Sequence, residues 1–421
     1  MTPRSRWTLH ILLGLAALVA VLGILAAWLV PSDEELAARI TAETEAKLGV
    51  KVTLGAVHWQ LLPTPSLLIE DAATVQPQPI SFKRLVASPR LGALIRGQLV
   101  LDDVFIDGGV LPQLSLRGLK LQPAPPKSDT APAPVERLHF RNLTWMTRYG
   151  RPLEFDGDVR FDTGWRPREA VLSRSGSSTP VQLDVLREGS DDRWQLKLAL
   201  GGGTANGHVE IKPGEGGLLQ LTGELAPTQV EVDSALDAFK RNSAVRGKAN
   251  GKTLLSAQGR TVAELSRSLH TRTTFTMRPA TLLRLDVDKA IRSAGRDRTG
   301  QTVLQSLTGQ MDTQNTPEGI VVRYSNLQAK GETFSASGGG TIANRQIDGE
   351  VKVDLIGGLV GVPLKITGPL ASPHVSVPAS AVAGAAAGAA VGTVLLPGIG
   401  TAIGASVGAT IGRAFGGDKK K

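Results

Sequence analysis

From Val50 onward, apolar and polar residues alternate along much of the chain. The alternation is clearest in residues 155–162, 194–200 and 351–355. The apolar members of these runs are Phe155, Val159, Phe161, Trp194, Leu196, Leu198, Val351, Val353 and Leu355. Because successive side chains of a strand point to opposite faces, a period of two predicts a sheet with one apolar and one hydrated face.

Glycine is frequent in this chain, and aromatic residues are scarce. There are 48 glycines, and aromatic residues make up 4% of the sequence. Together with many Val, Leu and Ile, this composition favours numerous short strands joined by tight turns. Glycine runs at Gly201–Gly203 and Gly338–Gly340 have the spacing of hairpin turns between such strands.

Helical patterns are few. Ser32 and Glu35 form a capping box, Leu36, Ile40 and Leu48 fall on one stripe, and Gly49 is placed to end the helix. A second capping box at Thr261–Glu264 predicts a short helix through residue 269, and residues 286–293 form a third candidate. The chain is therefore expected to be mainly β.

An uncharged segment, Ile11 to Val30, precedes the first predicted helix. Its length of about 20 residues matches a ~30 Å hydrocarbon core. Arg4 and Arg6 come before it and acidic residues 33–35 follow it, which predicts a cytoplasmic N-terminus with the rest of the chain on the other side. A cleaved signal peptide is the alternative, but the apolar segment is long for one and residues 25–28 make a poor cleavage site.

The far end of the chain has its own pattern, because residues 380–411 carry no charge. Glycines recur every fourth residue on both sides of Pro397–Gly398: Gly384, Gly388 and Gly392, then Gly400, Gly404, Gly408 and Gly412. This spacing lets helix backbones approach closely, as in paired membrane helices. A helical hairpin inserted into a membrane is expected. Packing on the sheet, or contacts in a homo- or hetero-oligomer, are the alternatives.

Proline is dense between residues 121 and 134, which predicts an exposed linker. Five segments follow from these boundaries: a cytoplasmic N-terminus and transmembrane anchor (1–31), a helix and β region (32–120), the linker (121–134), a second β region (135–378) and a membrane-interacting tail (379–421).

Several segments resemble the AsmA family of bacterial envelope proteins. The N-terminal resemblance rests on Leu48–Trp59, continuing through Pro63 to Ala72, and on Leu91–Gly108. The C-terminal resemblance rests on Thr253–Leu269 and Pro363–Val375. Their order behind a membrane anchor is that of the family, and they cover about two-thirds of the chain.

The resemblance implies a long, curved antiparallel sheet that forms a groove, in a protein of the inner membrane whose bulk is periplasmic. It also implies binding of membrane phospholipids and a role in lipid transport between inner and outer membranes, or in outer-membrane biogenesis. The nine alternating apolar residues are then the candidates for the groove. A scaffold or assembly factor for outer-membrane proteins that carries no lipid, and a membrane-perturbing protein built on the tail, are the rival functions.

Nothing in the sequence favours catalysis, a metal or a cofactor. The chain has no cysteine, and its six histidines (His10, His58, His139, His208, His270 and His374) show no metal-ligand spacing. Gly247 to Thr253 is similar to a phosphate-binding loop, but only three residues separate its glycines where four are needed. A hairpin turn is expected there, and an enzyme is not.

The net charge of +9 is concentrated between Lys240 and Arg298, where roughly ten more residues are basic than acidic. Outside the cytoplasm, anionic phospholipid headgroups or lipopolysaccharide are more plausible partners for this region than nucleic acid. A solvated basic face without a partner explains the same charge.

Overall fold

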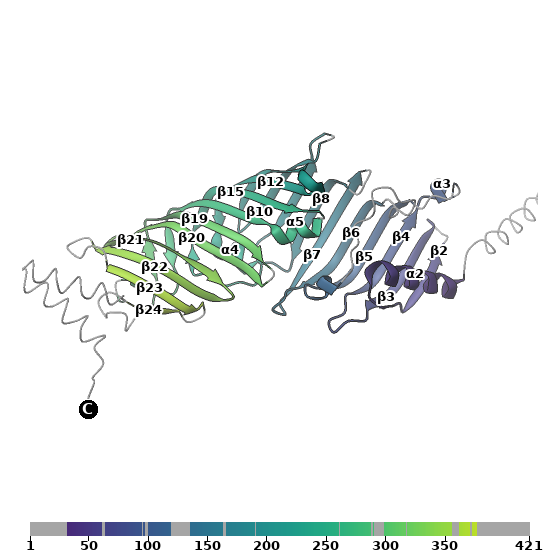
Figure 1. Ribbon diagram of the computed structural model, residues 1–421, viewed down its shortest axis with the longest axis horizontal. Coiled ribbons are helices and arrows are strands. Elements are labelled where there is room, and N and C mark those ends of the chain that lie inside the picture. Colours follow the sequence, from purple (N-terminus) through teal and green to yellow (C-terminus); the bar gives the residue numbers. More distant parts are fainter. Residues whose placement is uncertain are drawn as a thin grey trace, which may run out of the picture. The chain divides into compact units, whose positions relative to one another are not determined.

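The computed structural model describes residues 32–376, apart from short internal segments. Those segments are 61–63, 95, 97–99, 119–134, 163–165, 190, 261, 288, 290–298, 317, 356–361 and 371–372. The described chain is mainly β with a few short helices, as the sequence predicts (Figure 1). It divides into two compact units, and the division falls between Pro167 and Arg168.

The first unit is a sheet with one substantial helix. Its elements are α2 (Asp33–Leu48), β1 (Val52–Thr53), β2 (Ala56–Gln60), β3 (Ser66–Thr74), β4 (Ser81–Pro89), α3 (Leu91–Leu94), β5 (Leu101–Pro112), the 3-10 helix η1 (Ser115–Gly118), β6 (Val135–Met146) and β7 (Pro152–Asp162). Strands β1 and β2 both pair with β3, and the order then continues β4, β5, β6, β7.

One strand pair contradicts the expected antiparallel sheet. Strands β5 and β6 are parallel, with Leu101 beside Val135 and Pro112 beside Met146. Parallel neighbours need a connection of about a dozen residues or more. The chain between these two strands contains the predicted linker, and it is long enough to return to the end of the sheet where β5 begins. The linker therefore joins two strands of one sheet, and the boundary between the compact units lies later in the chain.

Helix α2 has the ends that its sequence predicts. The Ser32 side chain accepts a hydrogen bond from the Glu35 backbone N–H at 3.2 Å, and Gly49 ends the helix in the left-handed conformation with φ 68°. The Glu35 carboxylate bonds to Arg39 at 2.6 Å, so the capping box is formed on one side only. The helix packs against β1 and β2.

The second unit contains a larger sheet. Its elements are β8 (Arg166–Ser175), β9 (Gln182–Arg187), β10 (Arg193–Leu200), β11 (Gly203–Pro213), η2 (Glu215–Gly217), β12 (Leu219–Thr228), β13 (Val230–Glu231), α4 (Val232–Asp237), β14 (Val245–Arg246), β15 (Lys248–Gly259), α5 (Val262–Ser268), β16 (His270–Met277), β17 (Ala280–Leu282), β18 (Thr302–Leu304), β19 (Ser306–Thr316), β20 (Gly319–Lys330), β21 (Phe334–Ala343), β22 (Gln346–Leu355), β23 (Val362–Pro369) and β24 (His374–Ser376).

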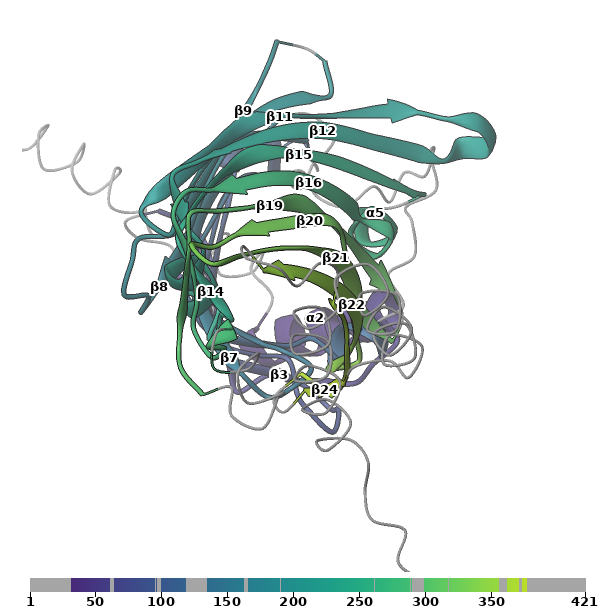
Figure 2. The same cartoon turned by 90° about the vertical axis from the view of Figure 1, so that its left-hand side faces the viewer.

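Antiparallel pairing runs through this sheet in the order β8, β9, β10, β11, β12, β15, β16, β19, β20, β21, β22, β23, β24. Figure 2 shows the strands of this unit stacked on one another and bent along their length, so its sheet is curved. Strands β14, β17 and β18 form a separate three-stranded sheet. Helix α5 confirms the second predicted helix, and most of the third lies outside the described residues.

The two glycine runs differ from each other. Gly201 and Gly202, with φ 55° and 70°, form the predicted turn between β10 and β11. The turn predicted at Gly338–Gly340 is wrong, because these residues lie inside β21. A Cβ atom at Gly338 would come within 2.2 Å of the Glu350 carbonyl oxygen, so the close approach of β22 accounts for glycine at this position.

Candidate functional site

One face of the second unit's sheet is almost entirely uncharged. Residues that lie directly opposite each other on neighbouring strands share a face, so the register defines this face row by row. One row is Leu196, Gly207, Leu225, Thr253, Thr273, Met311, Tyr324, Gly340, Gly349 and Ile366. The next is Trp194, Val209, Gly223, Leu255, Thr271, Thr313, Val322, Ile342 and Ile347. We call this the inner face.

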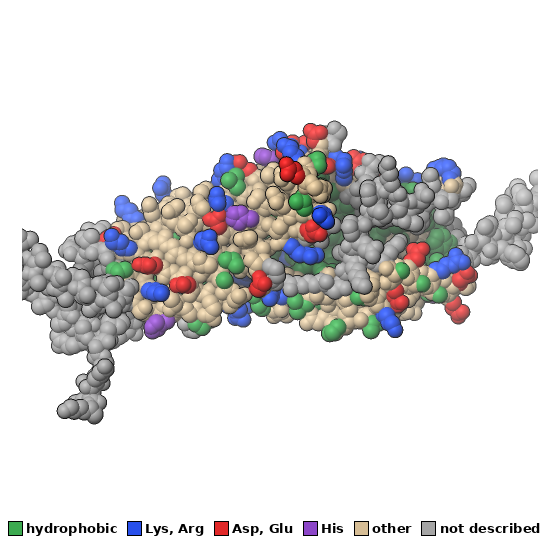
Figure 3. Space-filling view, in the orientation of Figure 1, with side chains coloured by type: hydrophobic (Ala, Val, Ile, Leu, Met, Phe, Trp, Pro, Cys, Tyr) green, Lys and Arg blue, Asp and Glu red, His purple; other side chains and the backbone are tan. Residues whose placement is uncertain are grey.

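The opposite face of the same strands is charged and polar. Its members alternate with those of the inner face, as Gln195 and Lys197 do on β10 and Lys352 and Asp354 do on β22. Figure 3 shows Lys, Arg, Asp, Glu and His side chains spread over the visible side of this unit, with few hydrophobic ones between them. The sheet thus has the one apolar and one hydrated face that its alternation predicts.

Part of the inner face is a closed core. Met277, Phe334 and Val353 are buried there against Ala280, Val287 and Leu304, which come from β17, β18 and the chain between them. Leu304 has no exposed surface and Val353 is 5% exposed. The three-stranded sheet therefore covers the row of the inner face that contains Ala249, Met277, Leu307, Ala329, Ala336 and Val353.

Much of the rest of the inner face is only half-buried, although Trp194 at its β10 end is buried. Leu196, Leu225, Leu255, Val322 and Ile342 are neither fully buried nor members of the packed cluster. An apolar ligand that covers this partly hydrated aliphatic surface removes it from water. The burial stabilises the complex by about 25 cal/mol per Å² of apolar surface covered. This uncovered part of the inner face is the candidate binding surface of the second unit.

The predicted groove residues of the second unit all fall on the inner face, in two different settings. On β10, the inner face carries Trp194, Leu196 and Leu198. Trp194 is 6% exposed, and the other two are half-buried. On β22, the inner face carries Val351 and Val353. Val353 belongs to the closed core, and Val351 packs against that core. Leu355 lies opposite Phe334 in the register of the same strand pair.

The first unit has an apolar face of its own. One row of its register is Leu67, Ala87, Val104, Leu138 and Val159, and the next is Ile69, Leu85, Ile106, Phe140 and Gly157. The predicted residues Phe155, Val159 and Phe161 lie on this face of β7 and are half-buried. Figure 3 shows a hollow over these strands, and the floor of the hollow is hydrophobic.

Ion pairs occupy the other face of the first unit. The Arg137 guanidinium donates to both carboxylate oxygens of Asp158, with Nε 3.1 Å from Oδ1. This hydrogen bonding holds the pKa of the Asp158 carboxyl below its ordinary value. His139 stacks on Phe105 with ring centroids 4.5 Å apart, and its Nδ1 lies 3.1 Å from an Asp103 oxygen. These polar side chains thus lie on the face opposite the apolar rows.

Five hydroxyl side chains interrupt the aliphatic inner face. They are Thr253 on β15, Thr271 and Thr273 on β16, Thr313 on β19 and Tyr324 on β20, and we call them the hydroxyl cluster. Alternation does not reveal this cluster, because β16 carries threonine on both faces. Burial raises the pKa of the Tyr324 phenol above its ordinary value.

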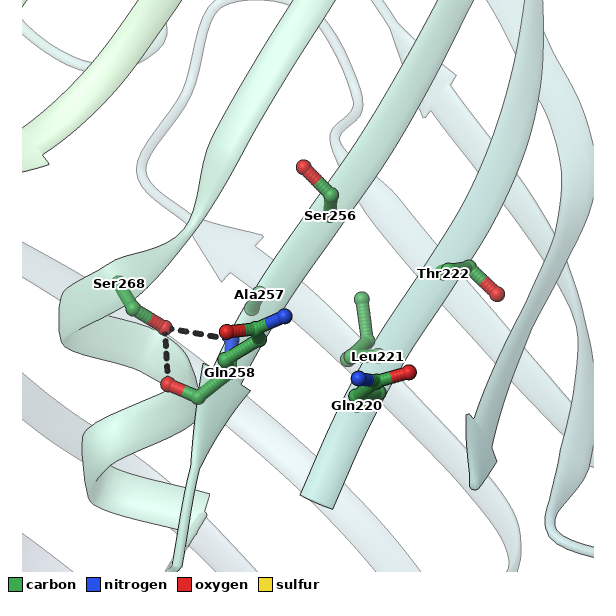
Figure 4. A pocket seen from close by; sticks show the side chains of 7 residues that line it. All are labelled: Gln220, Leu221, Thr222, Ser256, Ala257, Gln258 and Ser268. Atoms are coloured by element: carbon green, nitrogen blue, oxygen red, sulfur yellow. Dashed lines mark hydrogen bonds between the residues drawn. The ribbon is translucent and has the colours of Figure 1, made fainter. Parts of the chain in front are cut away.

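A shallow cleft of about 290 Å³ lies at the ends of β12 and β15, beside α5 (Figure 4). It is lined by Gln220, Leu221, Thr222, Ser256, Ala257, Gln258 and Ser268. Ser268 Oγ donates to the Gln258 carbonyl at 2.6 Å and accepts from its N–H at 2.9 Å, which fixes the end of α5 against the sheet. None of these side chains ionises near neutral pH, so the cleft offers no general acid or base.

The phosphate-loop-like segment is not a turn. Residues 248–253 belong to β15, and β14 pairs with β17, so the expected hairpin at this position is wrong. Gly247 bends the chain between the two strands with φ 143°. Within the described part of the chain, no three His, Asp or Glu side chains are placed to hold a metal ion.

The predicted anchor (11–30) and the seven tail glycines lie outside the described residues. Among residues 32–376, with the gaps given above, no helix is both long and apolar enough to cross a bilayer. Comparisons of the chain with models of protein families, with curated proteins and with solved structures found no match.

Proposed function

We propose that this protein is a membrane-anchored envelope protein of the AsmA type, which holds phospholipid acyl chains against its apolar sheet faces and assists lipid transport between inner and outer membranes. The observation that carries the proposal is the half-buried, uncovered part of the second unit's inner face, which continues from strand to strand without a charged residue in the rows of Leu196 and Leu255. The sequence resemblance and the uncharged segment 11–30 support the membrane context.

The proposed binding is non-directional. Each methylene of an acyl chain that leaves water for this face contributes about 0.8 kcal/mol. A chain that slides from one strand to the next exchanges one aliphatic contact for an equivalent one, so movement along the face needs no catalytic residue. The charged opposite face keeps the sheet soluble while the apolar face is occupied.

A scaffold that carries no lipid is the second candidate. The closed core around Val353 favours it, because that part of the inner face is already filled by the protein's own side chains. The two functions differ in what occupies the uncovered part of the face.

The variant Leu196→Asp distinguishes the lipid-binding function from the scaffold function. Leu196 is half-buried, and its neighbour on β11 is Gly207, so a carboxylate here can stay hydrated if the face is open. We expect this variant of the full chain to keep its melting temperature within a few degrees and to lose most of the lipid that co-purifies with the wild type. Mass spectrometry of bound lipid and thermal melting are the measurements.

Lys197→Asp is the matched control, because Lys197 is the next residue along and is exposed on the opposite face. It should keep both fold and lipid. A folded Leu196→Asp variant with unchanged bound lipid would contradict the lipid-binding proposal, and a wild type that carries no lipid would favour the scaffold.

A further inference from the structure

The hydroxyl cluster lies within the uncovered part of the inner face. Thr273 is beside Thr253 on one side and beside Met311 on the other, and Met311 is beside Tyr324. Thr271 is beside Thr313 in the adjacent row. All five side chains are half-buried. The cluster is therefore a contiguous polar patch with aliphatic neighbours, including Leu225 next to Thr253 and Leu255 next to Thr271.

Most of the hydrogen-bonding capacity of the cluster is unused. Among the described residues, the side chains of Thr271, Thr313 and Tyr324 make no hydrogen bond. Thr253 and Thr273 share one bond of 3.0 Å between their hydroxyl oxygens, which uses one of their two protons. The hydroxyl oxygens of Thr271, Thr313 and Tyr324 are not among the buried polar atoms that lack a partner, so they can still contact water. A ligand that covered them with hydrocarbon alone would leave their donors unsatisfied at a cost of roughly 1–3 kcal/mol, so a ligand that supplies acceptors here is favoured.

Two glycines follow Tyr324 in its row of the inner face. Its direct neighbour on β21 is Gly340, and the next position in the row is Gly349 on β22. Two consecutive positions of the row thus carry no side chain. No side chain at these two positions therefore stands between a ligand on the face and the Tyr324 phenol.

The chemistry of the patch limits the ligand. A hydroxyl donates to neutral acceptors as well as to anions, but the rows of the cluster contain no Lys or Arg to balance a phosphate charge. The aliphatic residues on both sides require hydrocarbon next to the acceptor. A neutral acceptor joined directly to hydrocarbon is the ester carbonyl of a diacyl lipid.

We infer that the hydroxyl cluster binds the ester linkages of a diacyl phospholipid and so determines which lipids, and which part of each lipid, the inner face holds. This inference rests on the proposed lipid-binding function. It assigns the acyl chains to the neighbouring aliphatic residues and leaves the headgroup outside the cluster.

The test compares two lipids that differ only at the linkage. Full-length wild type and variants are loaded from vesicles of phosphatidylglycerol with ester-linked chains or with ether-linked chains of the same length, and retained lipid is measured. We expect the wild type to retain the ester lipid roughly three- to tenfold better, because each hydrogen bond contributes about 0.5–1.5 kcal/mol. Tyr324→Phe keeps the ring and should remove most of that preference.

Thr273→Val is the second variant, because valine keeps the shape of threonine without the hydroxyl, and it should also reduce the preference. Thr274→Val, next along β16 and exposed on the opposite face, is the control and should retain the wild-type preference. Equal retention of both lipids by the wild type, or an unchanged preference in folded Tyr324→Phe and Thr273→Val, would overturn the inference while leaving the proposed function standing. Failure of the wild type to retain either lipid would overturn the proposed function itself, and with it the inference.

Discussion

Among single residues, the nine side chains predicted from alternation share apolar faces but differ in how much room surrounds them. Val353 touches the second layer formed by the three-stranded sheet, whereas Leu196 and Leu198 are half-buried and outside that cluster. Alternation reports which face a residue occupies. It carries no information on whether another segment covers that face, because the covering segment lies elsewhere in the chain.

Val353→Asp should therefore unfold or strongly destabilise the second unit, in contrast to Leu196→Asp. A carboxylate at this buried position has neither water nor a partner, which costs on the order of 3 kcal/mol or more. Urea unfolding followed by circular dichroism measures the effect. A urea unfolding curve close to that of the wild type would show that the core around Val353 opens readily.

The Arg137–Asp158 pair predicts a small pH dependence. The pKa of Asp158 is lowered in the folded chain, so the pair stabilises the fold above the ordinary carboxyl value of about 3.9, and this contribution is lost as pH falls through the lower folded value. Asp158→Asn should therefore lose less stability than the wild type between pH 6 and pH 3. Both side chains are more than a third exposed, so screening keeps the difference small.

Urea midpoints of the two proteins at pH 6 and pH 3 provide the comparison. High salt should reduce the difference further. If Asp158→Asn lost as much stability as the wild type between pH 6 and pH 3, then other carboxylates would account for the acid destabilisation.

At the scale of elements, the sequence predicts long, regular strands and well-capped helices, and it misses short or glycine-rich ones. Strands β7, β10 and β22 and helices α2 and α5 are confirmed near their predicted positions. Strands β14, β17 and β18 have two or three residues each, too few to show a period, and they pair across long sequence separations. Gly338–Gly340 has turn composition, but contact with a neighbouring strand decides its structure.

Leu304 is the residue that tests whether the three-stranded sheet is a structural layer. It has no exposed surface, and Leu304→Ala should cost about 2–5 kcal/mol of unfolding free energy. Its neighbour Val303 is 68% exposed, and Val303→Ala should change the unfolding free energy by about 0.5 kcal/mol or less. Similar unfolding curves for the two variants would show that this layer contributes little.

For the whole molecule, the sequence predicts the fold class but not the position at which the chain divides into compact units. A mainly β chain with an apolar and a hydrated sheet face follows from alternation alone. The division after Pro167 cannot be predicted in this way, because no change of composition marks it. The proline-rich segment, which the sequence offers as a boundary, lies between two paired strands. The hydroxyl cluster is equally invisible in the sequence, since its members come from four strands.

Topology is testable on the intact chain. A reporter that is active only outside the cytoplasm, fused after Val50, should be active, because the positive residues precede the apolar segment 11–30 and the negative ones follow it. The same fusion with Arg4 and Arg6 replaced by glutamate is the control and should lose part of that activity. Activity of a cytoplasmic reporter at the same position would reverse the predicted orientation.

The parallel pairing of β5 with β6 also has a consequence for how the first unit folds. Leu101 and Val135 are neighbours in the sheet, so the chain between them must close a large loop before their strands can pair. Loop closure opposes pairing by an entropy that grows only with the logarithm of loop length, about 0.6 kcal/mol for each doubling. Lengthening the connection should therefore leave equilibrium stability nearly unchanged and slow refolding, whereas cutting it would turn β5 and β6 into the ends of two fragments that must find each other by diffusion.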